Sequence, residues 1–210
     1  MVPLVRLPQN GRERLQFLIK QALDVGVFGV MLPHIETRGE ALAAVQATRY
    51  PQVPESSDRE PAGLRGTSYG FAARAWGLPG REYAKRADVW PHDANGELLL
   101  VLQIESVRGV QNIDAILSVP GIGAIFVGPA DLRMSLGVLE TAPELETAIQ
   151  TVLAATRAKG IPCGITAKWA TVKQRMAEGF QLITLGDDSG LSHSAGQALR
   201  VARRALRRDD

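Results

Sequence analysis

Two apolar runs near the middle of the chain each lead to a carboxylate. Residues 98–105 read LLLVLQIE, and residues 124–131 read AIFVGPAD. An uninterrupted apolar run of this length is typical of a strand buried on both faces. Residues 106–118 lie between the runs and carry apolar side chains at helical spacing. The pattern predicts a β-α-β unit, whose two strands must be parallel because a crossover joins them.

Glu105 and Asp131 are therefore expected side by side at the carboxyl ends of neighbouring strands. Barrel enzymes and open α/β enzymes keep their chemistry at this edge. Two carboxylates, with Gln103 one pleat behind Glu105, suit a divalent cation that takes oxygen ligands at roughly 2.1 Å. The alternative is that both carboxylates cap the helices that follow them.

The composition indicates one soluble domain spanning residues 1–210, since 45% of the residues are hydrophobic and 22% are charged. A formal net charge of +2 argues against nucleic acid or a membrane surface as a partner. No apolar run approaches the roughly 20 residues that span a bilayer. Cys163 is the single cysteine, so no internal disulfide can form, and we expect a cytoplasmic protein.

Strand-like and helix-like segments alternate along the whole chain. This order predicts an α/β fold with a parallel sheet and helices outside it, of the (β/α) TIM-barrel type. Six β-α units are present, so the barrel is incomplete by two units. Capping boxes are expected at 37–40 and 141–144. The expected strands are 2–7, 28–32, 98–105, 124–128, 161–166 and 181–185, and the expected helices include 12–25, 106–118, 171–178 and 192–208.

The polar, proline-rich residues 51–62 predict a long loop. Loops of this length over a barrel mouth are often lids, and the alternative is a surface insertion without a function.

Seven segments occur in the order found in a known enzyme family. Together they resemble the metal-dependent 4-hydroxy-2-oxoheptanedioate aldolases, which are class II pyruvate aldolases of the citrate-lyase β-subunit superfamily. The segments are VPLVR at 2–6, ALDVG at 22–26, GVMLP at 29–33, ATRYP at 47–51, GLRG at 63–66, VLQIE at 101–105 and FVGPADL at 126–132.

The resemblance implies a binding site for a metal ion and a 2-oxoacid. Glu105 and Asp131 look like the ligands of Mg²⁺, with Mn²⁺ and Co²⁺ as alternatives. Gln103 looks like a hydrogen-bond partner of the bound 2-oxoacid. The backbone around Ala130 and Asp131 looks like the amide pocket for its carboxylate.

The resemblance also implies catalytic groups. Arg6 looks like the guanidinium that stabilises the developing enolate, and Asp24 looks like the acid that supports a catalytic histidine. That histidine belongs to a strand preceding anything in this chain, because Met1 falls where the third barrel strand should begin. His34 follows the second predicted strand and is an alternative base.

The implied activity is carbon–carbon cleavage of a 4-hydroxy-2-oxoacid to pyruvate and an aldehyde by a homo-oligomer. One alternative is decarboxylation of oxaloacetate by an enzyme that resembles macrophomate synthase. Another is a truncated or inactive paralogue.

Four further residues or motifs offer rival sites. Lys168 follows a strand, as Schiff-base lysines do in other aldolases. Asp187 and Asp188 could hold a metal ion or cap the last helix. Arg65 could orient the metal site or brace the long loop, and Cys163 is expected to be a small core residue.

Overall fold

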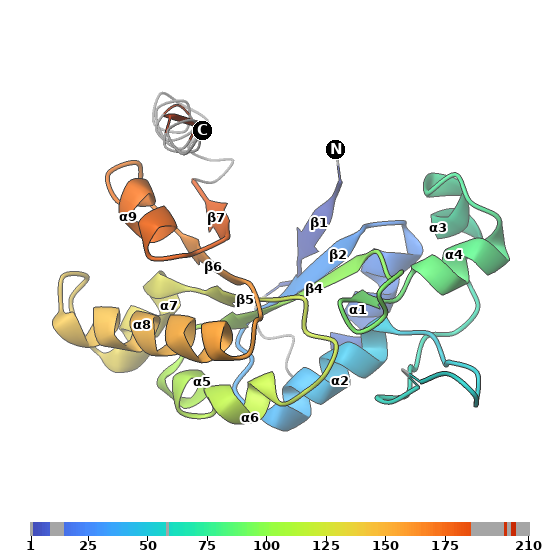
Figure 1. Ribbon diagram of the computed structural model, residues 1–210, viewed down its shortest axis with the longest axis horizontal. Coiled ribbons are helices and arrows are strands. Elements are labelled where there is room, and N and C mark those ends of the chain that lie inside the picture. Colours follow the sequence, from blue (N-terminus) through green and yellow to red (C-terminus); the bar gives the residue numbers. More distant parts are fainter. Residues whose placement is uncertain (1, 9–14, 58, 186–199, 201–202, 205–210) are drawn as a thin grey trace.

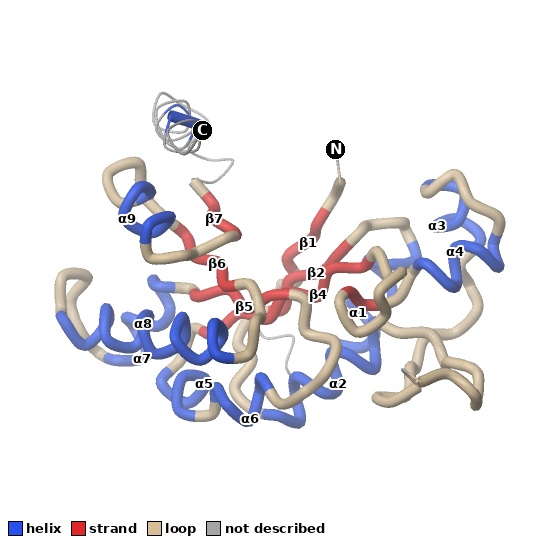
Figure 2. Tube along the Cα trace, viewed as in Figure 1, coloured by secondary structure: helices blue, strands red, loops and turns tan. Residues whose placement is uncertain are grey.

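The computed structural model describes residues 2–8, 15–57, 59–185, 200 and 203–204. These residues form one curled parallel sheet with helices packed on its outer side (Figures 1 and 2). The strands are β1 (Leu4–Arg6), β2 (Gly29–Leu32), β3 (Val89–Trp90), β4 (Leu98–Ile104), β5 (Ala124–Val127), β6 (Cys163–Thr166) and β7 (Leu182–Thr184). The helices are α1 (Leu15–Asp24), α2 (Arg38–Thr48), α3 (Gly70–Ala75), α4 (Gly80–Arg86), α5 (Val107–Gln111), α6 (Ile113–Leu117), α7 (Pro129–Leu136), α8 (Pro143–Ala158) and α9 (Val172–Ala177).

The strand order is β1-β2-β4-β5-β6-β7, and all the pairings are parallel. The short strand β3 pairs with the beginning of β4. Figure 1 shows the sheet curling so that β1 and β7 form the two ends of an open trough. The predicted incomplete barrel of parallel strands is therefore confirmed. In the register, Leu32 lies opposite Leu102 and Ile104 lies opposite Val127, so the adjacent strands β2, β4 and β5 reach the same edge.

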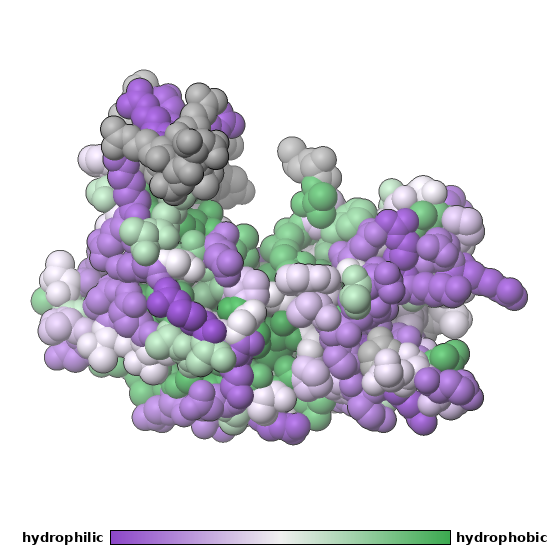
Figure 3. Space-filling model, viewed as in Figure 1, coloured by the Kyte–Doolittle hydropathy of each residue, from purple (hydrophilic) through white to green (hydrophobic). Residues whose placement is uncertain are grey.

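The two faces of the sheet bury different sets of side chains. The outer face of β4 packs Leu100, Leu102 and Ile104 into the main core, against the apolar stripes of the helices. The inner face carries a smaller cluster that includes Val101 and Phe126. Part of this apolar inner surface is visible between the two arms of the molecule in Figure 3. Because both faces of β4 are apolar, its sequence is a continuous hydrophobic run rather than an alternating one.

Residues 49–97 differ most from the sequence-based prediction, which placed only a loop there. The structure adds α3, α4 and β3. Their aromatic side chains form one cluster, in which Trp76 stacks on Phe28 with ring centroids 4.0 Å apart and packs edge-on against Tyr83. The helices have six and seven residues. Segments this short carry too few turns to show a helical period in sequence.

Two predicted helix boundaries need correction. The capping box at Thr37 is confirmed, with Glu40 and Thr37 each accepting the other's backbone N–H. The one predicted at 141–144 is wrong, because α8 begins after Ala142 and its first turn starts with Pro143, without a side-chain cap. The predicted helix 106–118 is divided at Asn112 into α5 and α6. The final predicted helix at 192–208 falls almost entirely outside the described residues.

Among the described residues, the longest helix is α8 with 16 residues, and no helix is both long and apolar enough to cross a membrane.

A buried ion pair fixes the segment that follows α2. Arg49 is fully buried and binds Asp88 through two hydrogen bonds of 2.7 and 2.8 Å. Its third donor reaches the carbonyl of Pro61 at 2.9 Å, and Gln52 adds a bond to Asp88 at 2.7 Å. These bonds satisfy both charges and attach the loop to the residue before β3.

We expect Asp88→Asn to destabilise the protein by about 3–5 kcal/mol, because it leaves the Arg49 guanidinium buried without its counter-ion. The free energy of unfolding is measured by urea denaturation followed by circular dichroism. Glu97→Gln is the matched control, since Glu97 pairs with Arg86 at a partly exposed position and its loss should cost under about 1 kcal/mol. Equal destabilisation by both substitutions would contradict the assigned role of Arg49 and Asp88.

Candidate metal centre

Three potential metal ligands meet at the carboxyl edge of the sheet. Glu105 follows β4, Asp131 lies in the first turn of α7 after β5, and His34 follows β2. One ligand atom from each residue lies within 4.8 Å of the other two. The predicted convergence of Glu105 and Asp131 is therefore present in the structure. Oxygen ligands about 2.1 Å from one cation can lie up to roughly 4 Å apart, so a modest adjustment would let both carboxylates bind the same ion.

Backbone contacts hold the Glu105 carboxylate in place. Glu105 is 3% exposed, and its Oε1 accepts the backbone N–H of His34 at 2.9 Å. The His34 imidazole Nε2 lies 3.6 Å from the same oxygen. A side chain at Gly128 would overlap Oε2 and Cβ of Glu105. Gly128, which follows β5 and has no side chain, thus leaves the space that the Glu105 side chain occupies.

Asp131 does not end β5, because that strand stops at Val127 and α7 has begun before Asp131. Gly128 is the N-cap of α7 and Pro129 begins its first turn, so Asp131 belongs to that turn. Proline is favoured at this position because it has no N–H that would need a partner. The N–H groups of Ala130 and Asp131 are in the first turn and have no carbonyl partner within the helix. The predicted amide pocket at Ala130 and Asp131 corresponds to this helix start.

The electrostatics of the site favour a cation. Burial raises the pKa of Glu105, and the nearby Asp131 carboxylate raises it further, whereas His34 and Arg6 act in the opposite direction. Two carboxylates and an imidazole are donors that Mg²⁺, Mn²⁺ and Co²⁺ accept. A bound divalent ion would offset both the repulsion and the burial. The donor set and the space therefore fit the metal ion that the sequence predicts.

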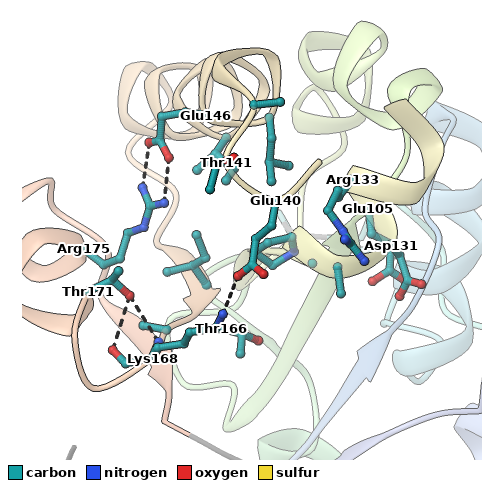
Figure 4. Close-up of a pocket in the computed structure, with 18 of the residues that line it drawn as sticks. Glu105, Asp131, Arg133, Glu140, Thr141, Glu146, Thr166, Lys168, Thr171 and Arg175 are labelled. Carbon is teal, nitrogen blue, oxygen red and sulfur yellow. Dashed lines mark hydrogen bonds and ion pairs between the residues drawn. The ribbon is translucent and has the colours of Figure 1, made fainter. Parts of the chain in front are cut away.

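The metal centre opens into a cavity of about 680 Å³ (Figure 4). Its lining includes Gln103, Glu105 and the start of α7 at one end, and Lys168 and Arg175 at the other. Gln103 is 7% exposed, and its side-chain Oε1 is buried without a hydrogen-bond partner. An unsatisfied buried amide at a cavity wall indicates that a bound molecule or a water completes it. Gln103 is thus placed where the sequence predicts a substrate contact.

The two predicted catalytic residues lie at opposite edges of the sheet. Arg6 ends β1 at the carboxyl edge, where its charge lowers the pKa of Glu105. Asp24 ends α1, which returns the chain to the amino edge, so the structure does not bring Asp24 to the metal centre. Asp24 instead lies 2.6 Å from Lys20 and 3.6 Å from Arg65. Its expected role beside a histidine stays a prediction.

The rival residues have other contacts. Lys168 lines the cavity and forms an ion pair with Glu140. Cys163 is buried, and burial raises the pKa of its thiol to about 11, so the thiol stays protonated near neutral pH. Arg65 stacks over the Tyr50 ring at 4.1 Å and donates to the Tyr83 hydroxyl, which favours the bracing role. Asp187 and Asp188 lie outside the described residues.

The sequence-based interpretation gave little weight to His34 and none to Gly128. His34 has a φ of 53°, a left-handed conformation for which histidine is enriched among non-glycine residues. This bend points its N–H at Glu105. The signal that could have revealed it was the position of His34 two residues past β2, at the same edge as Glu105.

The chain is similar in sequence and fold to known proteins. A family model described as HpcH/HpaI aldolase/citrate lyase matches residues 1–195. A 5-keto-4-deoxy-D-glucarate aldolase of Citrobacter koseri is 37% identical over 203 residues, which cover 95% of this chain and 71% of that protein. A crystal structure of a HpcH/HpaI aldolase/citrate lyase family protein from Burkholderia cenocepacia is 37% identical, with a TM-score of 0.71, and the match covers 98% of this chain and 72% of that one. A HpcH/HpaI aldolase from Desulfitobacterium hafniense is 25% identical, with a TM-score of 0.68 and coverages of 97% and 73%.

We expect Glu105→Gln to lower the affinity for Mn²⁺ by more than about 100-fold, a larger loss than the 10- to 100-fold typical of groups that only support a ligand. Glutamine keeps the size of the side chain but removes the charge. Binding is measured by isothermal titration calorimetry on the folded protein. Glu97→Gln serves as the control because Glu97 does not belong to this cluster. An Mn²⁺ affinity unchanged in Glu105→Gln would rule out this metal centre.

Proposed function

Because the chain belongs to the HpcH/HpaI aldolase/citrate lyase family and is a metal-dependent aldolase, we propose that it cleaves a 4-hydroxy-2-oxoacid to pyruvate and an aldehyde. The observation that carries the proposal is the convergence of Glu105 and Asp131 in one cavity with Gln103. The relative that acts as a 5-keto-4-deoxy-D-glucarate aldolase supports a substrate of the keto-deoxy sugar acid kind. Assembly as a homo-oligomer is part of the same proposal.

The chain's own residues orient the 2-oxoacid end of the substrate. The start of α7 at Ala130 and Asp131 receives the carboxylate, because a helix N-terminus favours an anion. The Gln103 amide, which has an unused oxygen at the cavity wall, forms a hydrogen bond with the same end of the substrate or with its bound water. Glu105 and Asp131 would hold a divalent cation, which would supply Lewis acidity to the 2-oxoacid.

Cleavage breaks the bond between C3 and C4 and leaves its electron pair on the pyruvate half as an enolate. Arg6 lies at the same edge as Glu105, and its guanidinium offsets the charge that grows on the enolate oxygen. The proton of the C4 hydroxyl passes to a base as the aldehyde forms. With the cation held by Glu105 and Asp131, the imidazole of His34 at this edge is left for the proton, and we assign it as the acceptor rather than as a metal ligand.

We expect Arg6→Met to lower kcat by about 100- to 1000-fold, as the loss of one preorganised donor does in comparable sites. Stability should change little, because β1 is exposed and the hydrogen bond that the Arg6 side chain forms with the described residues goes to the carbonyl of its neighbour Leu7. Pyruvate release is followed with lactate dehydrogenase, and stability is followed by thermal denaturation. Arg6→Lys, which keeps the charge without the planar fork, should recover part of the rate.

The control for this experiment is Arg38→Met, which removes an exposed guanidinium from the start of α2. Arg6 has no catalytic role if Arg6→Met keeps most of its kcat. Oxaloacetate decarboxylation is measured in parallel, because that reaction forms the same enolate without releasing an aldehyde.

A further inference from the structure

We propose that Thr166 donates a hydrogen bond to the carboxylate of the bound 2-oxoacid, and that Thr184 holds the Thr166 hydroxyl in place for this contact. This role rests on the proposed function, because it adds a residue to the site where that function places the 2-oxoacid. Thr166 is the last residue of β6, and Thr184 is the last residue of the neighbouring strand β7.

The side chain of Thr166 faces the inner side of the sheet. Cys163 and Ile165 of the same strand are buried in the main core on the outer side. Because side chains alternate along a strand, Gly164 and Thr166 face the opposite way. A side chain at Gly164 would overlap Phe126, which belongs to the inner apolar cluster. Thr166 is accordingly exposed and lines the cavity.

The strand register places Thr166 beside the start of α7. Val127 of β5 pairs with Ile165 of β6, so the residues that follow them, Gly128 and Thr166, are neighbours. Adjacent strands lie about 4.8 Å apart. The helix α7 begins directly after Gly128. Thr166 is therefore close to the helix end at which a carboxylate is expected to bind.

The metal centre approaches Thr166 from the other side of Gly128. A Cβ added to Gly128 would overlap Oε2 of Glu105, so the Glu105 carboxylate extends over the end of β5. Gly128 itself places no side chain between Glu105 and Thr166. Figure 4 shows Thr166 and the carboxylates of Glu105 and Asp131 around the same cavity. A 2-oxoacid bound at the metal centre thus has its carboxylate near both α7 and Thr166.

The hydrogen bond between the two threonines leaves one donor unused. Thr184 Oγ1 donates to Thr166 Oγ1 at 3.0 Å. A hydroxyl has a single O–H, so Thr166 accepts this bond and keeps its own proton for another acceptor. No described residue accepts that proton. A carboxylate suits the vacancy, because hydrogen bonds to a charged acceptor are stronger than those to a neutral one.

Threonine is also common in strands for packing alone, because its branched side chain fits a pleated sheet. A packing role needs the shape of the side chain, which valine reproduces. A binding role needs the hydroxyl, which serine retains. The two substitutions at Thr166 therefore separate the two roles.

The first test is Thr166→Val, which exchanges the O–H for a methyl group of similar size. We expect pyruvate to bind the Mn²⁺-loaded variant about 10-fold more weakly, as the loss of a hydrogen bond to a charged group does, with the affinity for Mn²⁺ unchanged. Both affinities are measured by isothermal titration calorimetry, and thermal denaturation checks the fold. Thr166→Ser should recover most of the pyruvate affinity.

Thr141→Val is the matched control. Thr141 is an exposed threonine that lines the same cavity from the segment before α8. The chemical change is the same as in Thr166→Val, and pyruvate affinity should match that of the unmodified protein.

The second test concerns Thr184 as a positioning residue. Thr184→Val removes the donor that orients Thr166 and should weaken pyruvate binding by about 3-fold, as the loss of a neutral hydrogen bond does. Adding Thr184→Val to Thr166→Val should cause no further loss, because the oriented hydroxyl is already absent. Thr184→Ser should restore the affinity. In the cleavage assay both valine variants should raise KM and leave kcat nearly unchanged, because the carboxylate keeps its charge throughout the reaction.

The proposed role of Thr166 is wrong if Thr166→Val binds pyruvate as tightly as the unmodified protein, or if Thr141→Val loses as much affinity. Weaker Mn²⁺ binding in Thr166→Val would also overturn it, since the effect would then lie at the metal centre. Additive losses in the double variant would overturn the role of Thr184. An unmodified protein that binds no pyruvate would reject the inference outright. If it binds pyruvate but cleaves no 4-hydroxy-2-oxoacid, the aldolase function alone is rejected, and the binding comparison still decides the role of Thr166.

Discussion

The close approach of Glu105 and Asp131 is the constraint on which the rest of the site depends. Two carboxylates whose oxygens lie within 4.8 Å repel one another, and burial of Glu105 adds to the cost. Such a pair persists only where the backbone holds it. Here the parallel register of β4 and β5 brings the two chain segments together, and the His34 N–H fixes one oxygen of Glu105. The two negative charges that repel one another here also attract a divalent cation.

The sheet can hold this arrangement because its strands are anchored by apolar packing on the outer face and are almost free of polar groups there. On the inner face of β4, Val101 packs in the small apolar cluster, whereas Gln103 points into the cavity from the same face. Side chains two residues apart share a face of a strand. On this face, β4 therefore contributes an apolar side chain at Val101 and a polar one to the cavity at Gln103, nearer its carboxyl end. The site is thus built at the point where the core ends.

Much of this could be predicted from sequence, for physical reasons that differ between segments. β4 and β5 were predictable because strands buried on both faces read as unbroken apolar runs, and the carboxylate site followed from their parallel order. The helices α3 and α4 were not predicted because their stability comes from aromatic contacts between distant residues, such as Trp76 with Phe28. The ion pairs of Lys168 with Glu140 and of Arg175 with Glu146 could not be predicted either, because each joins residues distant in the sequence.

The helix α7 connects the metal centre to the wall of the cavity. Its first turn carries Asp131, at the end of the helix that favours an anion. Arg133 lies two residues later in the same helix and lines the cavity. Since one helix carries both side chains, the position of α7 on the sheet fixes the metal centre and this wall of the cavity together.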